Sequence, residues 1–150
     1  MNSSRNSSSK RLVAVLNRDI LRELRMADDC IRRAGSLPRE QHPAIQRQFT
    51  QCAAAAMNNA TALAAEVLAL GGVPVDPGPQ PAGASRAVQA FAAPYRLMLH
   101  YRRRLRMAER LGLLRLREVF QQIVNTKEWH LAHCGQLQRG APGADRYLYG

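Results

Sequence analysis

The sequence predicts an all-α protein, an antiparallel four-helix bundle with one long crossover between its second and third helices. Apolar residues recur every three or four positions over four long stretches, which is the spacing of an amphipathic helix, and no stretch alternates as a strand does. Between the second and third of these stretches lie residues 73–85, VPVDPGPQPAGAS, with four prolines. Proline lacks the amide donor and clashes with the preceding helical turn, so this segment cannot be helical.

The length of the Pro-rich segment predicts how it connects its neighbours. An extended Pro-rich chain advances about 3.1 Å per residue, so the segment spans roughly 40 Å. A helix of about 27 residues has the same length. The segment can therefore return the chain from one end of a long helix to the other, and the helices on its two sides would then run parallel. A bundle with one long crossover has this connectivity.

The first two helices have clear ends. We expect residues 1–8, which are polar and Ser-rich, to form a disordered tail. The first helix follows over about residues 9–34 and ends before a glycine and a proline. The second helix runs from Pro43, which the first turn tolerates, to about Leu70, before two glycines. Its alanines at 53–56 make it thin, so a neighbouring helix can approach closely.

The third helix is expected from about Ser85 to Leu111, with Pro94 inside its pattern. This proline must either kink the helix or occupy the first turn of a helix that starts near Ala93. A fourth helix follows over about residues 114–138. The predicted bundle therefore covers residues 9–139, with a mobile C-terminal tail over 140–150.

Composition favours one domain with a strongly basic surface. The chain has 150 residues, is 46% hydrophobic but only 5% aromatic, and carries a formal net charge of +11. This charge suits a polyanionic partner such as nucleic acid or acidic lipid, or it makes a solvated basic surface. The candidate basic patch for nucleic acid or another partner comprises Arg96, Arg102, Arg103, Arg104, Arg106 and Arg110. No helix-turn-helix, zinc or RNA-binding signature accompanies it, so any nucleic-acid binding would be non-specific.

Other sequence features favour a cytoplasmic protein without a membrane span. The N-terminus has no apolar signal region, and the fairly apolar second helix is interrupted by polar residues. Cys30, Cys52 and Cys134 form no CxxC pair, which suits reduced thiols. No nucleotide-binding loop, Ser-His-Asp grouping or pair of acids at catalytic spacing is recognisable, which argues against an enzyme.

Several motifs over residues 12–138 resemble bacterioferritin, a member of the ferritin-like group. The residues that carry the resemblance are Leu16-Asn17 followed by Glu23, the helix ending Leu70-Gly71-Gly72-Val73-Pro74, Met57, and Lys127-Glu128-Trp129-His130. The resemblance implies that Glu23 and His130 are metal ligands. It also implies that Met57 lies where the family ligates haem between two subunits.

The chain departs from this family at most of its iron ligands. A di-iron centre needs a Glu from each of two helices and a Glu-x-x-His from each of the other two. The aligned positions in the second helix hold Ala56 and Asn59, and Lys127 replaces the acid before His130. The third helix offers no acid near Pro94. Glu23 and His130 alone should not hold two irons, so we expect no intact di-iron centre and a vestigial metal site at most.

The resemblance therefore predicts a catalytically degenerate ferritin-like subunit with a structural or binding role. It would assemble with itself or with an active ferritin-like subunit, and haem at Met57 remains open as its cofactor. One alternative is a basic bundle that binds nucleic acid non-specifically. Another is an active iron oxidase with non-standard ligands. Lys127 projects from an apolar stripe, where an unpaired ammonium is unfavourable, so we also predict an ion pair between Lys127 and Glu23 in place of metal.

Overall fold

The structure, a computed structural model, describes residues 2–38, 40, 42–78 and 94–140. These residues form four helices and no strand, which confirms the predicted all-α class. The helices are α1 (Asn2–Ser36), α2 (Pro43–Ala69), α4 (Pro94–Arg110) and α5 (Leu114–Gly140).

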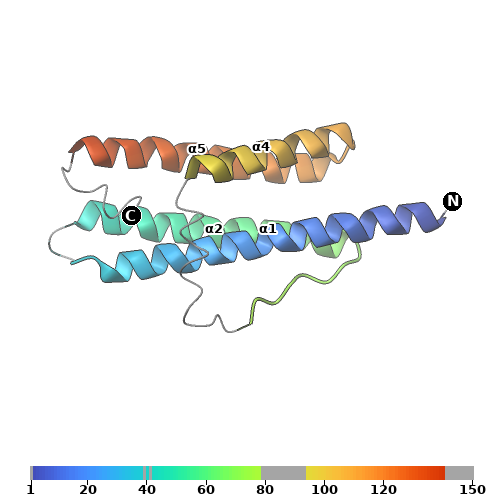
Figure 1. Ribbon diagram of the computed structural model, residues 1–150, viewed down its shortest axis with the longest axis horizontal. Helices are drawn as coiled ribbons and strands as arrows, with labels where there is room; N and C mark the ends of the chain where they lie inside the picture. The colour runs from blue at the N-terminus through green and yellow to red at the C-terminus, as the bar shows by residue number, and fades with distance from the viewer. Residues whose placement is uncertain (1, 39, 41, 79–93, 141–150) are drawn as a thin grey trace.

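The helices form two pairs (Figure 1). A short loop joins α1 to α2, which returns alongside it, and a tight turn joins α4 to α5, which does the same. In Figure 1, α4 runs in the same left-to-right direction as α2. Residues 72–78 leave the end of α2 without helical structure, and the rest of the Pro-rich segment lies outside the described residues.

Three predicted boundaries need correction or fall outside the structure. Helix α1 begins at Asn2, so the expected disordered tail over residues 1–8 is wrong for residues 2–8. That stretch has no proline or glycine to stop the helix. The described part of α4 begins at Pro94, so the choice between a kink and a first turn at this proline depends on residues that the structure does not describe. The helix expected to start near Ser85 and the tail at 141–150 fall among residues that the structure does not describe.

Asn17 of α1 holds the start of the segment that follows α2. Its side-chain amide donates to the Val73 carbonyl at 3.0 Å, and its carbonyl accepts from the Val75 amide at 2.9 Å. Gly72 lies against α1 at the same place, where an added Cβ would come within 2.7 Å of the Val13 methyls. These contacts direct the chain away from α2 along α1.

All four helices share one apolar core. Its largest members are Tyr101 of α4 and Phe120 of α5, whose ring centroids lie 6.2 Å apart, with Leu16 of α1 and Leu63 of α2. Burial of such side chains contributes about 1.5–3 kcal/mol each to stability. The core therefore sets the distance at which polar groups in the centre of the bundle meet.

A second apolar cluster joins α1 to α2 near the loop between them, with Ile45 and Phe49 at its centre. Cys30 of α1 and Cys52 of α2 meet there, and neither is in a disulfide. The hydrogen bond from Cys52 lowers the pKa of the Cys30 thiol although burial opposes the change. This contact could not be predicted from the sequence because the two cysteines are far apart in the chain.

Candidate functional site

A polar cluster lies inside the bundle, with one residue from each helix. Its members are Glu23 of α1, Asn59 of α2, Tyr101 of α4 and Lys127 of α5, and all four are buried. Glu23 lies on the apolar stripe of α1, and this stripe faces the core. Lys127 follows Phe120, Ile123 and Val124 along the inner face of α5.

The Glu23 carboxylate is the hub of the cluster. Its Oε2 accepts from Lys127 Nζ at 2.9 Å and from Asn59 Nδ2 at 3.2 Å. Glu23 is 0% exposed and Lys127 is 4% exposed. The contact expected between these two residues is therefore present, in a setting where neither charge is solvated.

The second carboxylate oxygen and the Tyr101 hydroxyl have no hydrogen-bond partner among the described residues. Burial and then the Glu23 charge raise the pKa of Tyr101 well above its usual value. Tyr101 therefore keeps its proton, and its hydroxyl is available as a donor to Glu23 Oε1. A buried carboxylate without such a donor would be destabilising.

Lys127 has further contacts that suit a cation. Its Nζ lies 3.1 Å from Met26 Sδ of α1 and 5.9 Å from the centre of the Tyr101 ring. The ring face is electron-rich and attracts an ammonium within about 6 Å. The ammonium is thus paired with one carboxylate and otherwise surrounded by weakly polar groups.

A second buried carboxylate, Asp19, lies one helical turn before Glu23. It is 0% exposed and accepts from Arg104 Nε at 2.8 Å and Arg104 Nη2 at 3.3 Å. His100 Nε2 lies 2.9 Å from Asp19 Oδ1, and Arg22 Nη1 lies 3.3 Å from it. Burial raises the pKa of Asp19, but the hydrogen bonds from His100 and Arg104 outweigh burial and lower it.

The Asp19 cluster is not among the predicted site residues. The signal was present, since Asp19 lies between Leu16 and Glu23 on the inward stripe of α1, and a buried carboxylate requires a partner. Arg104 belongs to the basic patch that the sequence predicts. In the structure this arginine instead forms an ion pair that joins α4 to α1.

The remaining predicted site residues lie apart from the polar cluster. His130 is half-buried on α5, beside Trp129 at 5.2 Å between ring centroids, and no contact joins it to Glu23 in the described structure. Met57 is 52% exposed on the outer side of α2. Among the described residues, no three His, Cys, Asp or Glu side chains are grouped as a metal site requires.

The six arginines of the predicted basic patch divide into two sets. Arg104 reaches Asp19 of α1, and Arg102 Nη2 lies 2.6 Å from Glu128 Oε1 of α5. The other four are exposed and form no ion pair with an acid in the described part of the chain. We call these four the α4 arginine face: Arg96, Arg103, Arg106 and Arg110.

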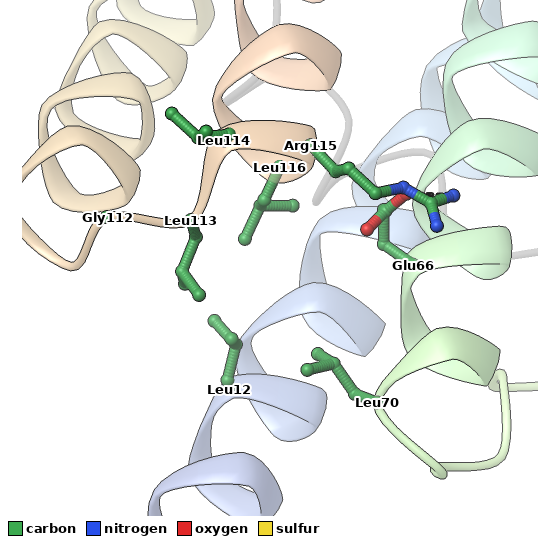
Figure 2. Close-up of a pocket in the computed structure, with 8 residues that line it drawn as sticks. All are labelled: Leu12, Glu66, Leu70, Gly112, Leu113, Leu114, Arg115 and Leu116. Atoms are coloured by element: carbon green, nitrogen blue, oxygen red, sulfur yellow. Dashed lines mark ion pairs between the residues drawn. The ribbon is translucent and has the colours of Figure 1, made fainter.

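A mainly apolar pocket of about 330 Å³ lies at the end of the bundle beside the turn between α4 and α5. Figure 2 shows leucines around it from α1, from the residue that follows α2, from the turn before α5 and from α5, with Arg115 reaching toward Glu66 at its edge. The Arg115 Nη2 to Glu66 Oε1 distance is 3.3 Å. The carboxylate and the guanidinium are paired with each other, so the pocket presents no net charge to a ligand.

The half-buried His130 makes stability depend on pH. Burial, followed by the charges of Lys127 and His133, lowers the pKa of His130 from 6.5 to about 4. The folded state thus prefers neutral His130, whose contribution is complete above about pH 6.5 and is lost as the pH falls toward 4. Substituting His130→Gln should flatten the free energy of unfolding in this interval, measured by urea titration at several pH values. Parallel profiles for the two proteins would contradict this assignment.

None of the described helices combines the length and the hydropathy needed to cross a membrane. Comparison of the chain with protein-family models, with curated proteins and with solved structures found no match.

Proposed function

We propose that this protein is a ferritin-like subunit in which an ion pair stands where active relatives hold iron, and that its role is structural or binding rather than catalytic. The observation that carries the proposal is the 2.9 Å contact between Lys127 Nζ and Glu23 Oε2 in the centre of the bundle. The direction of α4, parallel to α2, supports the ferritin-like part of the proposal.

The neighbours of the ion pair add further support. Glu23, Asn59 and Lys127 are three positions at which the resemblance expects iron ligands, and they lie in hydrogen-bond contact. The fourth helix of the cluster, α4, contributes Tyr101 rather than a residue near Pro94, where the resemblance had led us to look for an acid. A di-iron site likewise draws its ligands from all four helices of the bundle around one centre.

The donor set does not fit two iron ions. Two divalent iron ions need several carboxylates to offset their charge, and this centre offers one, already paired with an ammonium. A metal ion beside Lys127 would be repelled, and the Asn59 amide points its N–H at the same carboxylate oxygen. The chemistry of these residues is therefore that of a closed, charge-neutral contact.

Ferrous-iron oxidation tests the proposal against its alternative, an iron oxidase with non-standard ligands. We expect the pure protein to oxidise ferrous iron no faster than buffer, because the centre lacks acids to bind the metal. The measurement is the absorbance of ferric products under air. Activity that disappears on the Glu23→Ala substitution would establish the oxidase alternative.

Assembly is the second part of the proposal. The outer side of α2 carries small or apolar exposed residues at helical spacing, namely Ala54, Met57, Thr61, Ala65 and Leu68. A second copy, or a related active subunit, can approach this side closely. Met57 from each of two copies would then meet at the contact, where the two thioether sulfurs would hold a haem. A cytoplasmic location belongs to the same proposal, since the thiols of Cys30 and Cys52 suit a reducing compartment.

We expect a native mass at least twice the 16.7 kDa of the chain. The Ala65→Arg substitution places a large, charged side chain in this close contact. That side chain would keep the two copies apart, so the native mass should fall to that of a monomer. The matched control is Ala14→Arg, which adds the same charge to an exposed site on α1. Light scattering over a range of concentrations measures both, and a monomeric wild type would refute this part.

A further inference from the structure

We infer that the α4 arginine face is a binding surface for the phosphate backbone of a nucleic acid. The inference does not depend on the ion-paired centre, because the four arginines lie on the outside of α4 and share no contact with Glu23 or Lys127 in the described structure. Absence of nucleic-acid binding would therefore leave the proposed function unaffected, and the reverse also holds.

Packing sets the rotation of α4 about its axis, and two ion pairs mark the edges of its buried side. Arg104, on one edge of the helix, pairs with Asp19 of α1 at 2.8 Å. Arg102, on the other edge, pairs with Glu128 of α5 at 2.6 Å. Leu97, Met98 and Tyr101 are buried in the interior. The side opposite this interior, between the two edges, is therefore held toward solvent.

Four arginines lie on that side, with the half-buried Leu99 among them. At about 100° per residue, Arg96, Arg103, Arg106 and Arg110 fall within an arc of about 80°, and they span about 21 Å along the helix axis. One strand of a nucleic acid carries about six phosphates over that length. Arg103, Arg106 and Arg110 also line a surface hollow of about 420 Å³, together with Glu109. The acid is paired with Arg117 of α5 at 3.3 Å.

The composition of the exposed side favours nucleic acid over a membrane surface. Every exposed residue that the structure describes on α4 is charged: Arg96, Arg103, Arg106, Glu109 and Arg110. A helix that lies on a membrane inserts an apolar side among the lipids, and the apolar side of α4 is buried in the core. Arginine, in contrast, donates two parallel hydrogen bonds to a phosphate. Phosphates are the same at every base, so contacts of this kind predict binding that depends little on sequence.

The test is the salt dependence of binding to a fluorescein-labelled single-stranded DNA of about 20 nucleotides, followed by anisotropy. Four phosphate contacts predict a slope of log K against log salt of about −3, so affinity should fall about 50-fold between about 50 and 200 mM salt. Replacing Arg103, Arg106 and Arg110 together by glutamine should reduce the slope to about −1 and weaken binding at about 50 mM salt at least 100-fold.

The matched control replaces Arg11, Arg18 and Arg25 by glutamine, which removes the same charge from exposed positions on α1. Its slope should stay near that of the wild type. Thermal unfolding followed by circular dichroism checks that both triple variants fold, as expected for exposed substitutions. An equal loss of affinity in the control, or an unchanged slope in the α4 variant, would overturn the inference. So would wild-type binding to phosphatidylserine–phosphatidylcholine vesicles but not to the oligonucleotide.

Discussion

Replacing Lys127 by alanine should destabilise the protein by about 3–5 kcal/mol, the range for removing one partner of a buried ion pair. The substitution leaves the Glu23 carboxylate at 0% exposure with only Asn59 and, in reach, Tyr101 as donors. It also opens a cavity beside Met26, where the side chain of Lys127 lies now. The free energy of unfolding from urea titration at neutral pH measures the effect.

The double variant Lys127→Met with Glu23→Gln separates the charge from the volume. It keeps the volume of both side chains and removes both charges, so it should lose less stability than Lys127→Ala alone. The matched control is Lys10→Ala, which removes a lysine from an exposed site on α1 and should be nearly neutral. If Lys127→Ala proves as neutral as Lys10→Ala, the ammonium is solvated and the ion-paired centre does not exist.

Replacing Asp19 by asparagine should destabilise the protein by about 2–3 kcal/mol. The new amide keeps the shape, but Arg104, His100 and Arg22 lose the carboxylate that they share. This loss of stability is smaller than that expected for a fully buried ion pair, because the Arg104 side chain is 21% exposed and partly hydrated. Asp28→Asn is the control. Its ion pair with Arg32 is exposed, so it should change stability by less than about 0.5 kcal/mol.

The Asp19 substitution should also change how the protein responds to acid. The pKa of Asp19 is lowered in the folded state from 3.8, so its contribution is complete above that value and is lost as the pH falls further. The Asp19→Asn variant has no carboxylate to protonate at this position. The difference in free energy of unfolding between the wild type and the variant should therefore shrink as the pH falls below 3.8. A constant difference between the two proteins down to low pH would show that Asp19 acts through shape alone.

The sequence predicted the helices because their apolar periodicity is strong and long. It also predicted that Lys127, on an apolar stripe, needs an anion, and the bundle architecture that the resemblance implies then indicated Glu23 as its partner. The sequence left two alternatives for Pro94, because both a kinked helix and a first helical turn tolerate a residue without an amide hydrogen. The start of α1 was placed late because a serine-rich composition resembles that of disordered chains even where nothing interrupts the helix.

The roles of individual arginines could not be predicted in the same way. Arg102, Arg103 and Arg104 are adjacent in sequence, yet they point to α5, to solvent and to α1. Which of them is paired depends on the rotation of α4, which is set by packing against the other helices rather than by local pattern. The roles of Tyr101 and Asp19 depend on the same packing.

The central claim is that the Glu23–Lys127 pair, and not a metal ion, stabilises the centre of the bundle. Its most direct test is the thermal midpoint of the wild type after treatment with a strong chelator, and again with excess ferrous or zinc ion under anaerobic conditions. A ligand that binds the folded state raises this midpoint by mass action. The account predicts the same midpoint in all conditions. A rise with metal that is absent from the Glu23→Gln variant would contradict it.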